Sequence, residues 1–153
     1  MVPRLVGVNI IGIKWIFCNM TDEEGDVICN KAKLMAQGYI QVGVEFDETF
    51  APVGHIESIR VLLALACHLK FKLYQMDVKS AFLNGFLKEE VYVAHPKGFI
   101  DPHFLDHEHY LNESLYGLKQ APKAWYDRLT KHLMSNGFTR GQANRTLFIK
   151  KVD

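Results

Sequence analysis

Hydrophobic and polar positions along the first quarter of the chain follow the pattern of paired strands. Residues 14–19 and 27–39 are rich in branched and aromatic side chains, and they flank the polar segment TDEEGD. Gly25 in this segment suits a tight turn, so the pattern predicts a β-hairpin. The following stretch, 43–53, has no regular period and ends near a proline, which predicts irregular backbone.

Two later stretches carry the helical period. From Glu57 to Leu69 apolar residues recur at spacings of three and four, which predicts an amphipathic helix, and Lys70 suits the negative end of its dipole. A second helix is predicted over residues 121–137. Pro122 favours its first turn and Gly137 its end.

The remaining apolar runs are short. Residues 71–78 alternate and are rich in aromatic and branched side chains, which predicts a strand. Further strands are expected at 91–95 and 146–151, with a Pro/Gly loop at 96–106. This mixed order of strands and helices predicts an α+β fold in one domain, residues 1–153.

Composition narrows the class of protein only a little. Hydrophobic residues make up 48% and charged residues 23%, as in globular proteins. There are 18 basic and 17 acidic residues, so the basic excess of most nucleic-acid-binding proteins is absent. Any such binding is therefore expected to depend on local patches.

Three cysteines, Cys18, Cys29 and Cys67, form neither a disulfide framework nor a metal knuckle. Cys18 and Cys29 could face each other across the hairpin, although buried or idle thiols in a reducing compartment are favoured. No apolar run reaches the ~20 residues that span a bilayer, and the N-terminus lacks the pattern of a signal peptide. We expect a soluble, intracellular protein.

The segment QMDVKSAFLNG, residues 75–85, contains the first candidate chemistry. Asp77 comes at the end of the predicted strand, where a carboxylate can hold a hard cation such as Mg²⁺. The turn that follows could cradle a phosphate, and Phe82 could pack beneath a sugar ring. By spacing alone, a single aspartate in this position is more often a turn or capping residue.

A second candidate is ESLYGLKQAPKAWYDRL, residues 113–129. Gly117 permits a close approach of backbone, while Lys119 and Gln120 place a cation and an amide just before a predicted helix N-terminus. This combination suits an anionic or base-paired ligand. The alternative is an ordinary helix start, which the spacing alone favours.

Together these two segments resemble the reverse transcriptase domain of copia-type retrotransposons, whose stretches read approximately QLDVKSAFLNG and LYGLKQAPRAWY. The resemblance runs from about Val2 to the end of the chain and is closest to plant elements. Further segments match in the same order, namely KWIF (14–17), NKAKLMAQGYIQ (30–41), FDETFAPV (46–53), IRVLLALA (59–66), EEVYVAHPKGFIDP (89–102) and LFIKK (147–151).

The resemblance implies a right-hand polymerase fold, with fingers over about 1–70 and a partial palm over about 71–153. It implies that Lys31 and Lys33 contact the incoming deoxynucleoside triphosphate. Asp77 would bind metal with the backbone carbonyl of Val78, and Phe82 would exclude a ribose 2′-hydroxyl. Four residues would support the nascent base pair and the template strand, namely Tyr116, Gly117, Lys119 and Gln120.

The family's reaction is two-metal nucleotidyl transfer with Mg²⁺, on an RNA template and a DNA primer. Integrase and RNase H are polyprotein neighbours in intact relatives, which work in cytoplasmic particles. The other metal ligands come from a Tyr-x-Asp-Asp motif, which this sequence does not contain. Since one carboxylate holds two Mg²⁺ ions poorly, we expect this chain to be inactive by itself.

Several positions depart from the family's pattern. Cys18, Met20, Cys29 and Glu113 stand where basic residues are usual, and Lys33 replaces an arginine. One residue is also missing around Val42 and Gly43. These departures weaken the expected attraction for phosphate and suggest a decayed element.

A histidine-rich segment invites a different hypothesis. His103, Asp106, His107 and His109 lie close together in sequence, in what we predict to be a loop between Pro102 and Leu111. Their spacing fits no common zinc pattern, so we do not expect a metal site.

Two alternatives to a polymerase domain remain. The chain could be a non-catalytic remnant that binds nucleic acid through its residual basic groups, Lys31, Lys33, Lys119, Lys123 and Arg128. It could also be a domesticated interaction protein that uses exposed aromatic surfaces.

Overall fold

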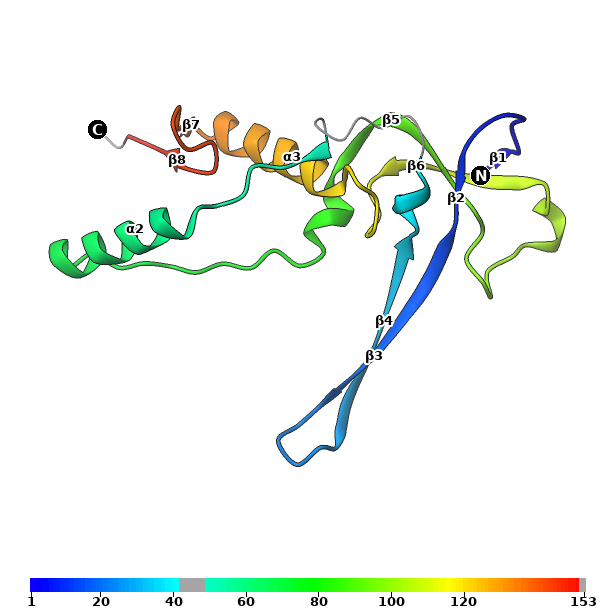
Figure 1. The fold of residues 1–153 in the computed structure, drawn as a ribbon, viewed down its shortest axis with the longest axis horizontal. Coiled ribbons are helices and arrows are strands. Elements are labelled where there is room, and N and C mark those ends of the chain that lie inside the picture. The colour runs from blue at the N-terminus through cyan, green and yellow to red at the C-terminus, as the bar shows by residue number, and fades with distance from the viewer. Residues whose placement is uncertain (42–48, 152–153) are drawn as a thin grey trace.

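The computed structural model describes residues 1–41 and 49–151 and shows a mixed α+β architecture (Figure 1). Four short strands form the main sheet in the order β1-β6-β5-β2. The strand β5 pairs antiparallel with β6 and parallel with β2. The predicted α+β class is therefore confirmed. The bounds of the four strands are β1 (Val2–Pro3), β2 (Ile10–Ile11), β5 (Phe86–Val93) and β6 (His107–Glu113).

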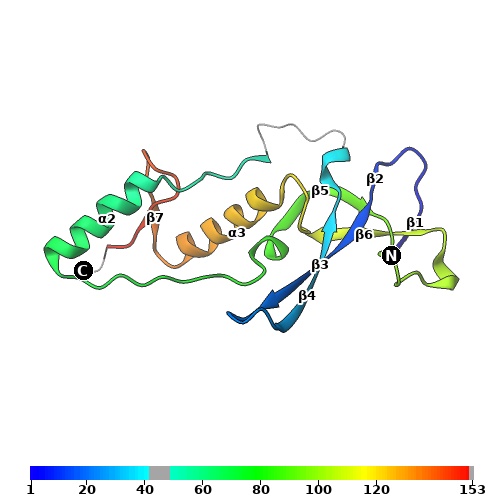
Figure 2. The ribbon, with the colours of Figure 1, turned by 60° about the horizontal axis from the view of Figure 1, so that its bottom comes forward.

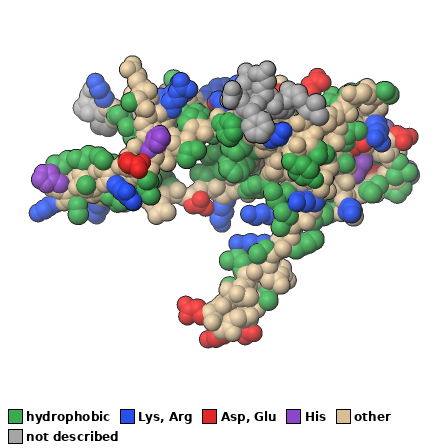
Figure 3. Space-filling view, in the orientation of Figure 1, with side chains coloured by type: hydrophobic (Ala, Val, Ile, Leu, Met, Phe, Trp, Pro, Cys, Tyr) green, Lys and Arg blue, Asp and Glu red, His purple; other side chains and the backbone are tan. Residues whose placement is uncertain are grey.

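The predicted hairpin is present, with β3 (Ile13–Thr21) and β4 (Val27–Ala36) paired antiparallel. It projects away from the rest of the molecule (Figure 1). Gly25 in its turn has a φ of +93°, in the region that favours glycine. Acidic side chains gather at the tip of the hairpin (Figure 3).

The hairpin register separates the two cysteines that could have faced each other. Cys18 lies opposite Lys31, and Cys29 lies opposite Met20. All three cysteines are free, in agreement with the expectation of buried or idle thiols, and they are exposed rather than buried.

A small core joins the base of the hairpin, the sheet and the start of the second long helix. Its buried residues are Ile11, Ala36, Val91, Val93, Leu118 and Ala121. Because these residues come from four separate segments, the core fixes the hairpin relative to the sheet.

The helix α3 (Ala121–Ser135) confirms the second predicted helix. Pro122 lies in its first turn, where a missing N–H costs nothing, and Gly137 follows its end with a φ of +83°. After the helix the chain forms a two-stranded ribbon of β7 (Thr139–Arg140) and β8 (Phe148–Ile149). The strand predicted over 146–151 is therefore shorter than expected.

The helix α2 (Ile56–Leu69) confirms the first predicted helix and ends at Lys70, whose φ of +56° is left-handed. Its apolar face is open to solvent, since Ile59 and Leu63 are 55% and 54% exposed. Hydrophobic side chains follow the visible side of this helix (Figure 3). Within the described residues, no helix has the length and apolar character that crossing a membrane requires.

The strand predicted over 71–78 is not formed. This stretch is an extended run, exposed at every residue, that connects α2 to the 3₁₀ helix η2 (Ala81–Asn84) and joins no sheet (Figures 1 and 2). Alternation of side chains makes a strand only when a neighbour pairs with its backbone. None of the described residues pairs with 71–78 in this way.

The segment expected to be a loop up to Leu111 instead contains β6. Val93 lies opposite His109 and Val91 lies opposite Leu111. The polar composition of HEHYLNE does not indicate a strand. The alternation of its side chains can be interpreted as a strand only once the partner strand β5 is known. The loop predicted at 96–106 is otherwise confirmed, with one 3₁₀ turn, η3 (Pro102–Phe104). The position near Val42 and Gly43, where one residue is missing relative to the family's pattern, lies outside the described residues.

Candidate functional site

Two of the predicted site residues, Lys33 and Phe82, contact the ring of a third, Tyr116. The ammonium group of Lys33, on β4, lies 5.4 Å from the centre of this ring. Phe82, on η2, meets it edge-on, with 6.0 Å between ring centroids and 71° between ring planes. Segments far apart in sequence thus bring a cation and two aromatic rings together at the base of the hairpin.

The backbone beside Tyr116 explains why this meeting is fixed. The Ala36 N–H donates to the Tyr116 carbonyl oxygen at 2.7 Å. Gly117 has a φ of +90°, and a Cβ atom there would overlap the Ala36 carbonyl oxygen. A Cβ at Gly38 would overlap the Gly117 carbonyl oxygen in turn. The glycine predicted to allow close approach therefore does so, against the end of β4.

The turn that carries Phe82 is held from several sides. The buried Ser114 donates a hydrogen bond from its hydroxyl to the Phe82 carbonyl oxygen. Arg128 Nη1 donates to the Asn84 carbonyl oxygen at 2.6 Å. A Cβ atom at Gly85 would come within 2.6 Å of the Ala124 Cβ, so the turn packs directly on α3.

Lys119 and Gln120 lie just before α3, as predicted. Lys119 Nζ donates to the Gln41 carbonyl oxygen at 3.3 Å. Gln120 precedes the first helical residue and is only 5% exposed. Neither polar atom of its side chain finds a hydrogen-bond partner within the described part of the chain.

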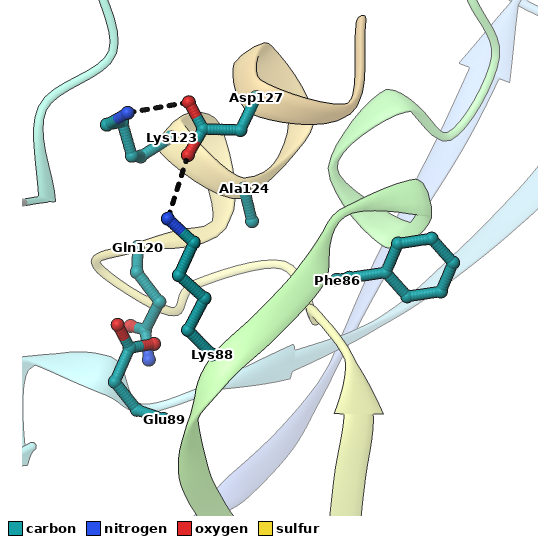
Figure 4. Close-up of a pocket in the computed structure, with 7 residues that line it drawn as sticks. All are labelled: Phe86, Lys88, Glu89, Gln120, Lys123, Ala124 and Asp127. Carbon is teal, nitrogen blue, oxygen red and sulfur yellow. Dashed lines mark hydrogen bonds and ion pairs between the residues drawn. The ribbon is translucent and has the colours of Figure 1, made fainter. Parts of the chain in front are cut away.

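Gln120 also lines a cavity of about 260 Å³ between β5 and α3 (Figure 4). Two lysines of this cavity converge on one carboxylate. The Nζ atoms of Lys123 and Lys88 lie 2.6 and 3.6 Å from Asp127. Lys123 thus already has an acidic partner, which reduces its availability to phosphate.

Asp77 and Val78 lie on the exposed run 71–78, away from any sheet. Their donor atoms, a carboxylate and a backbone carbonyl, are the oxygen ligands that Mg²⁺ prefers. Across residues 1–41 and 49–151, no three His, Cys, Asp or Glu side chains gather closely enough to hold a metal ion.

Lys31 and Lys33 share one face of the hairpin, because alternate residues of a strand point the same way. Both are exposed, and the residues opposite them are Cys18 and Ile16. Arg128, by contrast, lies 3.8 Å from Glu113 and 4.7 Å from the centre of the Phe86 ring. Glu113, which departs from the family's basic pattern, is thus an ion-pair partner here.

The pKa of His109, on β6 of the sheet, is clearly shifted. Burial lowers the pKa of His109 below its ordinary value of 6.5, and the nearby His95 and the amino terminus lower it further. The two imidazole rings meet at 4.8 Å between centroids. His109 lies on β6 and His95 lies two residues beyond the end of β5.

The residues that the sequence did not indicate hold the backbone of the site in place and supply no reactive group. Ser114 and Gly85 stand inside the two quoted motifs, but nothing in their spacing shows that they contact each other. Their backbones meet directly, since the Ser114 N–H donates to the Gly85 carbonyl oxygen at 2.7 Å. Only the tertiary structure reveals this contact.

Comparison with protein families identifies the chain. The family described as "Reverse transcriptase (RNA-dependent DNA polymerase)" matches residues 1–153. The chain belongs to this reverse transcriptase family. Its relatives further mark it as a reverse transcriptase domain of the copia-type retrotransposon Pol polyproteins.

Two relatives of this reverse transcriptase domain come from Arabidopsis thaliana. The Retrovirus-related Pol polyprotein from transposon RE2 is 41% identical over 148 residues, which is 96% of this chain and 10% of the relative. The polyprotein from transposon RE1 is 41% identical over 143 residues, 93% of this chain and 10% of the relative.

A third relative comes from Nicotiana tabacum. The Retrovirus-related Pol polyprotein from transposon TNT 1-94 is 38% identical over 142 residues, 90% of this chain and 10% of the relative. The chain thus spans about a tenth of the length of these polyproteins. No solved structure matches it.

Proposed function

We propose that this chain is the fingers and first palm region of an RNA-directed DNA polymerase with a right-hand fold, fingers over about 1–70 and palm over about 71–153. The observation that carries the proposal is the meeting of Lys33, Phe82 and Tyr116. It places a cation from the hairpin beside two aromatic rings from the body of the domain. A nucleoside triphosphate offers the matching chemistry, since it has an anionic end and a flat base.

Each predicted residue has a role in this proposal. Lys31 and Lys33 attract the triphosphate from one face of the hairpin. Phe82 limits the space beside the sugar and so favours deoxynucleotides. The backbone turn at Tyr116 and Gly117, followed by Lys119 and Gln120, supports the new base pair and the template strand.

Asp77 and Val78 would hold Mg²⁺ through a carboxylate and a backbone carbonyl. When bound, Mg²⁺ would offset the charge of the triphosphate and favour attack by a primer 3′-hydroxyl. The chain's own part is to supply the negative charge of Asp77 and to orient the nucleotide between the hairpin and the Phe82 turn. An RNA template, a DNA primer and neighbouring element proteins such as integrase and RNase H are the partners we propose.

A nucleotide titration tests the proposal. We expect dATP with Mg²⁺ to bind the 153-residue chain, as followed by isothermal calorimetry, and Asp77→Asn to weaken the binding about tenfold or more. Asp106→Asn makes the same charge change on an exposed loop residue and should leave binding unchanged.

Binding of an RNA–DNA hybrid gives an independent test. Its affinity should fall as salt rises, because phosphate contacts release counterions. Substitution of Lys33 by Gln should reduce the slope of this dependence. The proposal would be contradicted if neither nucleotide nor hybrid bound at low salt.

A further inference from the structure

We propose that Ser114 is a positioning residue for Phe82, and that its hydroxyl sets how strictly the chain selects deoxynucleotides over ribonucleotides. The positioning itself follows from contacts in the structure. The consequence for nucleotide selection depends on the proposed function.

Ser114 contacts both ends of the turn that carries Phe82. Its N–H donates to the Gly85 carbonyl oxygen at 2.7 Å, and its hydroxyl donates to the Phe82 carbonyl oxygen. The residue is 3% exposed, so water does not compete effectively for these bonds. One residue thus holds the turn at two points.

Other residues also restrain the turn. Arg128 holds the Asn84 carbonyl oxygen, and the Leu83 N–H donates to the Ser80 carbonyl oxygen at 2.9 Å. Gly85 packs on α3 through its backbone. Loss of the Ser114 hydroxyl would therefore remove one of two hydrogen bonds of the peptide that follows Phe82, and would leave the Leu83 N–H bond and the other restraints, including the Ser114 N–H bond, in place.

The Phe82 residue is only partly covered by its surroundings, so the backbone restraint contributes to the position of its ring. The ring belongs to a residue that is 37% exposed, and it meets Tyr116 only edge-on. A side chain that selects by contact must be held to about 0.5 Å. Ser114 restrains the backbone of Phe82 by a hydrogen bond, and Tyr116 contacts its ring.

The position of the ring decides selection by steric exclusion. A 2′-hydroxyl adds one oxygen atom to the sugar, so a small outward shift of Phe82 makes room for it. Ser114 itself need not contact the nucleotide. Its effect should therefore fall on the ratio of affinities for the two sugars rather than on binding as a whole.

The test combines Ser114→Ala with Ser114→Cys, which keeps the shape of the side chain with a somewhat larger atom but donates only weakly. Ser135→Ala is the control, because it removes another hydroxyl that bonds a backbone carbonyl, at 2.8 Å to His132. Two quantities are measured on the 153-residue chain. They are the nuclear Overhauser contacts between the Phe82 and Tyr116 rings, and the ratio of Kd values for ATP and dATP with Mg²⁺.

We expect both Ser114 variants to weaken the ring contacts and to lower the ATP-to-dATP ratio by about threefold or more, while dATP affinity changes little. The Ser135→Ala chain should match the wild type in both quantities. If Ser114→Ala does not fold, Ser114→Cys decides the question by the same two quantities. Unchanged ring contacts in the folded variants would overturn the positioning role.

Failure of the proposed function gives a different result. A wild-type chain that binds neither nucleotide would contradict nucleotide binding and overturn the selection role. The ring contacts, measured without nucleotide, would still decide whether Ser114 positions Phe82.

Discussion

The ammonium group of Lys33 lies 5.4 Å from the centre of the Tyr116 ring, and this contact joins the projecting hairpin to the body of the domain. A cation over an aromatic face is attracted by the ring quadrupole. Phe82 contacts the same ring edge-on. Lys33 is therefore both a stabilising contact of the Tyr116 ring and a candidate ligand-binding residue.

The contact between Lys33 and Tyr116 should be measurable as a coupling energy. We expect a double-mutant cycle of Lys33→Gln and Tyr116→Leu to give about 0.5–1 kcal/mol in the free energy of unfolding from urea titrations. Lys33→Arg should retain most of it, because the guanidinium also stacks on aromatic rings.

Lys31 is the matched control for that cycle. It lies two residues away on the same face of the hairpin, opposite Cys18. Lys31→Gln should show no coupling with Tyr116→Leu. Equal coupling for the two lysines would mean that general charge, rather than the ring contact, is responsible.

The glycine at the junction gives a second prediction. Gly117→Ala should lower the free energy of unfolding by about 3 kcal/mol, because a left-handed φ is strained and the new Cβ overlaps Ala36. Gly98→Ala should cost only about 1 kcal/mol. Gly98 has nearly the same φ, +88°, but has no neighbour within 4 Å of the added atom.

The difference between these two variants isolates the close contact between the hairpin and the Tyr116 turn. Urea titrations of both chains measure it directly. Equal losses of stability would show that only backbone strain matters at Gly117 and that the junction is looser than the structure has it.

Stability should also depend on pH through His109. Its pKa in the folded chain is lowered by burial, then by His95 and the amino terminus, while Glu108 opposes the shift. The unfolded chain therefore binds the proton more readily. This contribution is fully present above pH 6.5 and is lost as pH falls through the folded-state pKa.

Urea titrations between about pH 7.5 and about pH 5.5 should show stability falling with pH, and His109→Gln should flatten part of the slope. His68→Gln, on the exposed side of α2, is the control and should keep the wild-type slope. If the His109→Gln chain kept the wild-type slope, His109 would not be a source of this pH dependence.

Local signals in the sequence were sufficient for the elements that are stable through their own caps and turns. Pro122 and Gly137 bracket α3, and Gly25 sits in the hairpin turn. These residues determine the conformation of the backbone next to them, so the elements could be predicted from the local sequence. The resemblance to the reverse transcriptase family added the candidate site residues.

Features that depend on distant partners could not be predicted. The alternating run 71–78 has the composition of a strand but lacks a paired neighbour among the described residues. The polar strand β6 forms because β5 lies beside it. The bond from Ser114 to Phe82 likewise needs the tertiary fold, since no spacing rule links the two positions.

The most direct test of the account is a map of amide and aromatic chemical shifts as dATP and Mg²⁺ are added to the 153-residue chain. We predict that the largest changes cluster at Lys33, Asp77, Phe82 and Tyr116. Lys119 and the exposed face of the hairpin at Lys31 should follow. Changes confined to other regions, such as α2 or the cavity beside Asp127, or no changes at all, would contradict the claim that the hairpin and the Phe82 turn form one nucleotide site.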